Sequence, residues 1–254
     1  MDILTHGLTG IAFSTAIMAH SKNTWRQKVV IGSCGLLGGI LPDVDVISKW
    51  SGFDATFGVW FGLKESGNAI FGQTHWYSHH VFTHSIVGAL FFTLLLIGSY
   101  IGIKQLQKRK HSPQLKLYAL AFLLGYMGHL FEDMITPGGP WKGIAFFWPS
   151  TDFTGGWGKI WWWDNYDLFL IVCAAILING IILLSRYKTK LLSKLTLLIG
   201  LLLFVIQIER RDYDYNQKAH AQNTKEAKDA QKRYLGEPLY TFIQKVDEMI
   251  PVAF

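Results

Sequence analysis

The sequence predicts an all-α, polytopic membrane helical bundle of about six spans, with a metal site at one membrane face. Half of the 254 residues are apolar and only 17% are charged, whereas a soluble domain has about 25% charged residues. The apolar residues are gathered in blocks. Short connections rich in Lys and Arg alternate with those blocks along the chain. Composition, block length and this charge alternation together favour a multi-span membrane protein.

Three blocks are long and almost free of charge, at 86–103, 166–185 and 191–208. A helix needs about 20 mostly apolar residues to cross a bilayer. Lys194 lies near the start of the third block, where its side chain can reach the interface. We therefore expect these three segments to span the membrane.

Three weaker blocks carry ionisable residues at one end, at 4–20, 29–47 and 115–135. The second block ends in Leu-Pro-Asp-Val-Asp. With the three stronger blocks they make six spans. The alternative is that some of these weaker segments are buried helices of a soluble domain.

The basic connections 21–28, 104–116 and 186–194 hold three, five and four Lys or Arg residues and no acidic residue. Cytoplasmic loops carry such an excess. In a six-span chain all three connections fall on one side, so we expect that side to be cytoplasmic. The net charge of +6 then reflects topology, and no nucleic-acid partner is expected, because no basic stripe with interleaved aromatics is present.

The composition changes after residue 208. Residues 1–208 are expected to form the membrane-embedded domain, and 209–254 a charged helical C-terminal tail. Within the tail, 209–234 is rich in alanine and charges of both signs, and 239–254 alternates apolar and charged residues. The first part is typical of a solvated helix, and the second is expected to pack on the body.

Ionisable side chains at membrane depth are costly and indicate function. In the six-span topology they all fall at the extracytoplasmic face. His129 and Asp133, four residues apart, share one face of the helix expected from the block 115–135. Imidazole and carboxylate ligands suit Zn²⁺, with Mn²⁺ or Fe as alternatives. The candidate ligands are His6, Asp43, Asp45, His79, His84, His129 and Asp133.

Seven candidate ligands exceed the needs of one tetrahedral ion, so we expect two or more divalent ions, as in two-metal hydrolytic sites. Each residue also has a simpler interpretation as an interfacial polar group or a helix end. Four other ionisable residues are not assigned to the site: Glu132, His20, His111 and His220.

At these residues the chain resembles the YdjM-like family, inner-membrane, metal-dependent hydrolases described as LexA-regulated. The matching stretches follow the family's order and extend over 1–149. They are Thr5-His6-Gly7, Leu41-Pro42-Asp43-Val44-Asp45, His79-His80-Val81-Phe82-Thr83-His84-Ser85, and Gly125 to Gly139 followed by Trp148-Pro149. His80 and Val81 replace an Arg and a Gly of the family. Family register favours His79 as the ligand, and helical i,i+4 spacing with His84 favours His80.

The resemblance implies a hydrolase in the bacterial or archaeal cytoplasmic (inner) membrane. The family is in turn similar to zinc-dependent phospholipases C, which implies hydrolysis of a phosphoester in a lipid or lipid-linked substrate. Asp43 or Asp45 is then a candidate catalytic base toward the water. Thr83 and Ser85 are candidates for orienting the ligands.

The loop 136–165 contains six tryptophans among glycines. Tryptophan is enriched at membrane–water interfaces, so a passive aromatic belt is one interpretation. The other is a wall of a lipid-binding groove, with Trp141, Trp148 and Lys142 as substrate-binding candidates; Lys159 is a further possible phosphate partner.

A rival function is a metal-ion binding or transport membrane protein without hydrolytic activity. Groups of this kind also line ion pathways. A transporter would spread them through the depth of the bilayer, whereas here they gather at one face. The sequence therefore favours the hydrolase.

Overall fold

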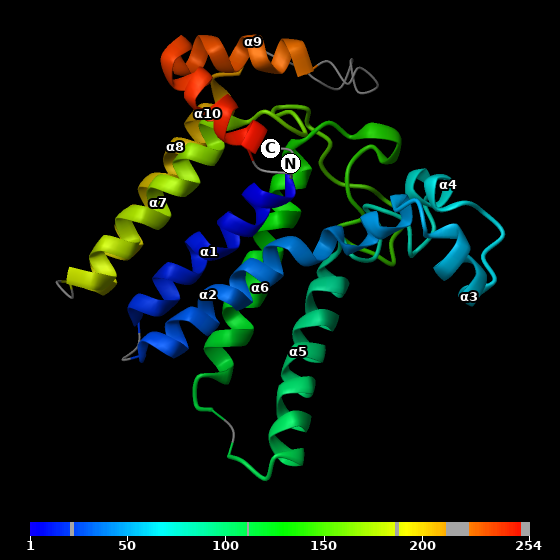
Figure 1. The fold of residues 1–254 in the computed structure, drawn as a ribbon, viewed down its shortest axis with the longest axis horizontal. Coiled ribbons are helices and arrows are strands. Elements are labelled where there is room, and N and C mark those ends of the chain that lie inside the picture. Colours follow the sequence, from blue (N-terminus) through cyan, green and yellow to red (C-terminus); the bar gives the residue numbers. More distant parts are fainter. Residues whose placement is uncertain (21–22, 111, 186–187, 212–223, 250–254) are drawn as a thin grey trace.

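The computed structural model describes residues 1–20, 23–110, 112–185, 188–211 and 224–249. Every regular secondary-structure element in these residues is a helix (Figure 1). Six helices are long: α1 (Ile3–His20), α2 (Trp25–Ile40), α5 (Ile86–Leu106), α6 (Leu115–Ile135), α7 (Tyr166–Ser185) and α8 (Thr189–Glu209). They confirm the helices expected from the six apolar blocks. The basic residues Lys22 and Arg186 lie outside the described residues.

The inner helices α1, α2 and α6 form the centre of the bundle. Their backbones approach each other closely at glycines. A Cβ added at Gly35 of α2 would lie 2.3 Å from the Gly10 carbonyl oxygen of α1. A Cβ added at Gly39 would lie 2.3 Å from the His6 carbonyl oxygen. Small residues allow membrane helices to approach this closely. The close approach brings polar side chains of α1 and α6 beside the backbone of α2.

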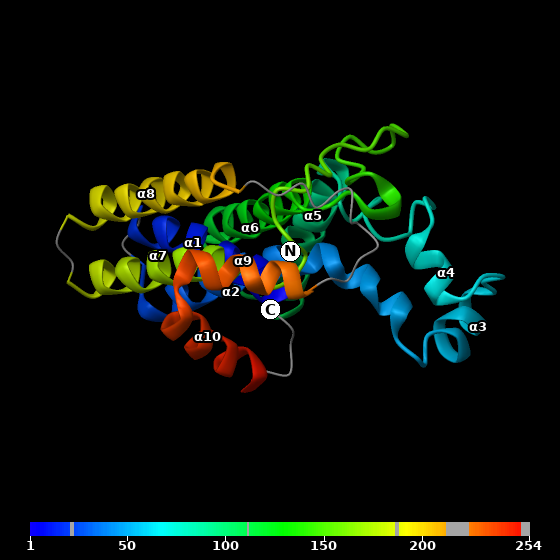
Figure 2. The same ribbon diagram turned by 90° about the horizontal axis from the view of Figure 1, so that it is seen from above.

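The outer helices α5, α7 and α8 pack around this centre (Figures 1 and 2). Their outer faces expose large apolar side chains, for example Leu94 on α5, Ile181 on α7 and Leu198 on α8. Water does not favour such faces, whereas hydrocarbon does. These helices therefore have the surface of a membrane protein.

Four helical segments are long and apolar enough to cross a membrane: Trp25–Lys49, Ile86–Leu106, Tyr166–Ser185 and Thr189–Glu209. The segment Trp25–Lys49 includes one of the weaker blocks. α1 and α6 do not reach this level of apolarity. Among the described residues, four spans are thus supported by length and composition, not the six that the sequence predicts.

The second block does not continue as one α-helix, because α2 ends at Ile40 and a 3-10 helix, η1 (Leu41–Lys49), follows with Pro42 in its first turn. Proline lacks the N–H that a continuing α-helix needs. The 3-10 helix starts just before Asp43 and Asp45, so both carboxylates follow directly after the change of helix type.

The helix ends next to the basic connections lie at one end of the bundle, along the left and lower edges of Figure 1. The opposite end carries the loops and short elements. These are the π-helix η2 (Asp54–Gly58), α3 (Val59–Phe61), α4 (Gly67–Gly72), the 3-10 helix η3 (Gly139–Trp141), α9 (Thr224–Leu235) and α10 (Glu237–Met249). Both views place α3 and α4 to one side of the bundle (Figures 1 and 2).

Two C-terminal helices pack on the start of α7. The Tyr166 hydroxyl donates to the Asp247 carboxylate of α10 at 2.7 Å. The backbone N–H of Asp167 donates to Gln231 of α9 at 3.1 Å, and Arg211 forms two 2.7 Å contacts with the Asp167 carboxylate. In its described residues the charged tail is therefore helical and packed on the body.

Candidate metal centre

All seven predicted ligands lie at the end of the bundle opposite the basic connections. Donor atoms within 4.8 Å of one another form three overlapping groups. They are Asp43, His84, His129 and Asp133; Asp43, Asp45 and His79; and His79, His80 and His84. The groups share members, so their donors make one continuous cluster. His6 belongs to none of the three groups and contacts Asp133 at the edge of the cluster. Carboxylates and imidazoles gathered in this way can hold divalent cations.

The pair on α6 has the predicted geometry, because His129 and Asp133 are one helical turn apart. Nε2 of His129 lies 3.1 Å from Oδ2 of Asp133. Nδ1 of His129 lies 2.7 Å from the carbonyl oxygen of Gly39, so Nδ1 is the protonated donor. Nε2 is thereby left with its lone pair toward the cluster. Metal-binding histidines are commonly held in this manner, and the glycine packing of α2 supplies the carbonyl.

The two carboxylates of η1 have different surroundings. Asp43 Oδ1 lies 3.5 Å from Nε2 of His84 and 3.6 Å from Nε2 of His129. Asp45 contacts Nδ1 of His79 at 2.7 Å and accepts a hydrogen bond from the Thr83 hydroxyl. Asp45 is therefore more tightly engaged than Asp43, and Thr83 contacts a candidate ligand as the sequence predicts.

The segment between α4 and α5 consists of turns, so the helical spacing argument for His80 is wrong. The backbone of His80 takes a left-handed conformation (φ 65°), and Nδ1 of His80 lies 3.1 Å from the Gly143 carbonyl oxygen. The turns still bring it beside His84, with ring centroids 4.8 Å apart. His79 joins two donor groups and His80 one, so both remain candidate ligands.

The pKa values of two histidines in these turns, His84 and His80, are shifted in opposite directions. Burial alone would lower the pKa of His84, but the carboxylates of Asp45, Asp133 and Asp43 outweigh it and raise the pKa well above its usual value. Burial, then the neighbouring charges of His79 and His84, hold the pKa of His80 well below its usual value. The carboxylates thus create a site that favours positive charge.

Ser85 is used differently from its predicted role. Its hydroxyl caps α5 by accepting from the Gly88 N–H at 2.9 Å, and it donates to the Phe82 carbonyl oxygen at 2.6 Å. It therefore fixes the start of α5, directly after His84, instead of contacting a candidate ligand.

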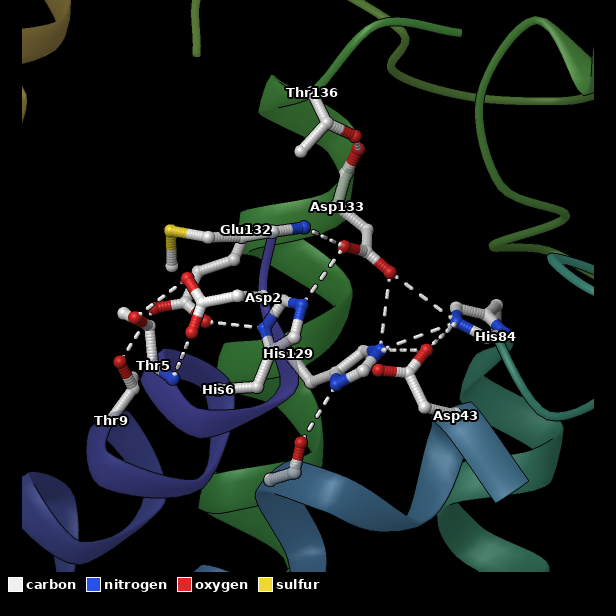
Figure 3. Close-up of polar contacts among 12 residues, drawn as sticks. Asp2, Thr5, His6, Thr9, Asp43, His84, His129, Glu132, Asp133 and Thr136 are labelled. Carbon is white, nitrogen blue, oxygen red and sulfur yellow. Dashed lines mark hydrogen bonds and ion pairs between the residues drawn. The ribbon is translucent and has the colours of Figure 1, made fainter. Parts of the chain in front are cut away.

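Glu132 was not expected to belong to the site, yet it contacts a candidate ligand (Figure 3). Its Oε2 lies 2.6 Å from Nδ1 of His6, and its Oε1 accepts from the Thr9 hydroxyl at 2.6 Å. Nε2 of His6, fully buried, then faces Oδ1 of Asp133 at 3.1 Å. Oδ1 of Asp133 also accepts from the α-amino group of Met1 at 2.9 Å.

The sequence carries a weak signal for Glu132, which stands three residues after His129 and so near it on the helix surface. Of the other unassigned histidines, His20 is exposed at the far end of α1, and His111 and His220 lie outside the described residues.

A cavity of about 460 Å³ adjoins the donor cluster. Asp43 and Asp133 reach its wall, together with Lys49 and several aromatic side chains. The aromatic residues are Phe71, Trp141, Trp162 and Trp163. A cavity with ionisable and aromatic walls is typical of a small-molecule site.

Trp141 lines the cavity, and its ring centroid lies 4.5 Å from that of His80. The other two substrate-binding candidates do not line this cavity. The chain reverses where Ile144 pairs with Thr154, and Trp148 packs on Phe82 instead. Lys142 is exposed in the turn after η3. Lys49, whose Nζ lies 4.4 Å from the centre of the Phe71 ring, takes the place expected for a lysine.

The donor set fits divalent metal ions. The carboxylates of Asp43 and Asp133 converge with Nε2 of His84 and His129, while Nδ1 of His6, His80 and His129 is occupied by a protein oxygen. Nε2 of His6 is buried without a well-aligned hydrogen bond. The Asp133 carboxylate lies 3.1 Å away but is poorly aligned with it, and buried polar groups usually have a well-aligned partner. The arrangement therefore has both the ligands and the surrounding contacts of a metal centre.

Comparison with known proteins gives one match. No curated protein and no solved structure matches the chain. The model of the YdjM inner membrane protein family matches residues 1–212, which include the entire donor cluster and all six long helices. The chain therefore belongs to the YdjM inner membrane protein family.

Proposed function

We propose that the protein is a membrane-bound, metal-dependent hydrolase that cleaves a phosphoester in a lipid-type substrate. The observation that carries the proposal is the convergence of His and Asp donors beside an aromatic-walled cavity at one end of an apolar bundle. We propose that all six long helices cross the bilayer, with α1 and α6 shielded inside. The positive-inside rule then puts the site on the extracytoplasmic face.

Two or more divalent ions, with Zn²⁺ favoured by the ligand types, would be held by His6, Asp43, Asp45, His79, His84, His129 and Asp133, with His80 as a further ligand. Bound there, they would polarise a phosphoryl oxygen and activate water. Glu132 orients His6, and the Gly39 carbonyl orients His129. Thr83 holds Asp45 in place.

Asp43 is the better candidate for the catalytic base. Its side chain is 13% exposed and lines the cavity, whereas that of Asp45 is 5% exposed and is held by His79, His84 and Thr83. An oxygen of the Asp43 carboxylate that binds no ion can take a proton from the attacking water, whose oxygen bonds to phosphorus as the ester P–O bond breaks. The same proton then passes from Asp43 to the departing alcohol oxygen. The Lys49 ammonium on the same wall can contact the phosphoryl oxygens.

The proposal is tested by assaying the purified full chain in nanodiscs, loaded with Zn²⁺ or Mn²⁺, against phosphatidic acid, a phosphodiester phospholipid and a water-soluble nitrophenyl phosphodiester. We expect turnover that a chelator abolishes and that His129→Ala and Asp133→Ala both eliminate. Asp152→Ala, at an exposed loop site, is the control and should retain activity.

Failure of the metal-loaded protein to hydrolyse any phosphoester would overturn the proposal. Bound metal without turnover would then favour the rival function, metal binding or transport.

A further inference from the structure

A second hollow of the bundle is almost entirely apolar. It has a volume of about 350 Å³ and lies between α6 and α8, over α1 and α7. Small residues from all four helices create the space: Ala12, Gly128, Ala175 and Gly200. Phe131 of α6 and Phe204 of α8 stand on its walls. The volume falls in the range of about 300–1,000 Å³ typical of ligand pockets.

The position of this groove, between helices that can cross a membrane, determines which kind of molecule can enter it. α7 and α8 are two of the four helices apolar and long enough to cross a membrane. Their outer faces expose Ile181 and Leu198. A groove between such helices opens to hydrocarbon and not to water. Its occupant is therefore an alkyl or prenyl chain.

One end of the groove adjoins the metal centre. Thr9 and Glu132 line it there, and Glu132 holds Nδ1 of His6. The next residue, Asp133, lines the cavity of about 460 Å³ beside the donor cluster (the polar cavity). Consecutive residues of one helix thus face an apolar groove and a polar cavity, a spacing suited to one amphipathic molecule.

We propose that the groove binds one hydrocarbon chain of the lipid whose phosphorylated head group occupies the polar cavity. This inference rests on the proposed function and narrows its substrate to membrane lipids. A chain that moves from the bilayer into the groove gains little hydrophobic free energy, because both are apolar. Selectivity must then come from packing against the groove walls and from anchoring of the head group.

Gly200→Leu is the informative variant, because a Cβ at Gly200 meets only the Ala175 Cβ, at 3.6 Å, and the larger side chain can enter the groove. Gly98→Leu is the matched control. Gly98 lies on α5, away from the groove, and a Cβ there meets nothing within 4 Å.

The probe is a phosphatidic acid with a photoactivatable diazirine in its acyl chain, mixed into phosphatidylcholine nanodiscs that contain the full chain. We expect cross-links concentrated on peptides that contain Phe131 and Phe204. Gly200→Leu should reduce them at least fivefold relative to cross-links on α5, and Gly98→Leu should leave that ratio unchanged. Cross-links spread evenly over the outer helices, or unaffected by Gly200→Leu, would overturn the inference.

The measurement needs no turnover, so it remains decisive if no hydrolysis is found. With an active enzyme, Gly200→Leu should raise KM for the long-chain lipid about tenfold and leave hydrolysis of the water-soluble phosphodiester unchanged. Equal KM values for the lipid in the two Leu variants would refute the groove while leaving the hydrolase intact.

Discussion

The inner helices α1, α2 and α6 contact one another through glycine backbone and buried polar side chains, whereas the outer helices α5, α7 and α8 contribute mainly apolar surface. Gly10 and Gly35 meet backbone to backbone, while Gly98 and Gly180 have open space at the Cβ position. His6, Glu132 and Asp133 are all buried on the inner helices. Polar groups in a bundle are tolerated where protein, and not lipid, surrounds them.

This difference explains why α1 and α6 are not apolar enough to qualify as spans by themselves. Their polar residues are satisfied by partners on the other inner helices. The outer helices meet lipid and need a continuous apolar surface. The donor cluster lies at one end of these inner helices.

The largest expected effect comes from a side chain placed between the inner helices. Gly35→Leu would bring its Cβ to 2.3 Å from the Gly10 carbonyl oxygen, so α1 and α2 must separate, at a cost of about 3 kcal/mol, the upper end of the usual cost of overpacking. The yield of monodisperse protein and its thermal midpoint in detergent should collapse. Gly98→Leu on α5 should behave like the parent chain. Equal stability of the two variants would contradict the distinction between inner and outer helices.

Glu132 tests whether buried polar residues of the inner helices serve the site. Glu132→Ala removes the acceptor that holds Nδ1 of His6. Loss of such an orienting contact weakens metal affinity about 10–100-fold. Competition with a chromogenic chelator measures the affinity. Glu65→Ala, an exposed position far along the chain, is the control, and equal affinities would remove Glu132 from the account.

The outer helix α7 is held at its start by contacts that depend on pH. Burial, aided by Asp247 and Asp2 against the opposing effect of Lys228 and Tyr166, raises the pKa of Asp164 to about 6. Because the folded state binds this proton more tightly, the stabilisation is complete below about pH 4 and is lost as the pH rises through 6.

Hydrogen exchange of α10, corrected for the intrinsic pH dependence, should therefore be slower at pH 5 than at pH 7.5. Asp164→Asn mimics the protonated carboxyl and should abolish the difference. A parent chain whose corrected exchange is the same at both pH values would refute this role for Asp164.

The smallest expected effect concerns a side-chain hydrogen bond between α7 and α1. Asn179 donates to the Thr15 hydroxyl at 2.7 Å. Hydrogen bonds between membrane helices contribute about 0.6 kcal/mol on average. A double-mutant cycle with Asn179→Leu and Thr15→Ala should give a coupling of this size. A coupling several times larger would mean that polar contacts, and not apolar packing, hold the outer helices.

The local features of the sequence predicted the helices and much of the centre. Apolar blocks gave five of the six long helices to within three residues, because block length and helix length are tied together by the bilayer. The block 29–47 extends seven residues past the end of α2 at Ile40. The His129–Asp133 pair followed from helical spacing alone. Charge alternation correctly put all seven candidate ligands at one end of the bundle.

Contacts between distant segments were not predictable in the same way. Glu132 meets His6 across 126 residues, and Lys49 reaches the cavity only through the 3-10 turn after α2. The chain reversal at Ile144 brings Trp162 and Trp163, not Trp148, to the cavity wall. The irregular turns around His79 and His80 have no periodicity from which side-chain directions can be read.

The most direct test of the account is the metal content of the purified full chain. Elemental analysis after exhaustive dialysis should give about two divalent ions per chain. Asp43 belongs to two donor groups, so Asp43→Ala should lower the content to one ion or fewer, while Asp152→Ala should match the parent. A parent chain with no metal above the dialysis buffer, or an Asp43→Ala variant with full content, would contradict a metal centre at this site.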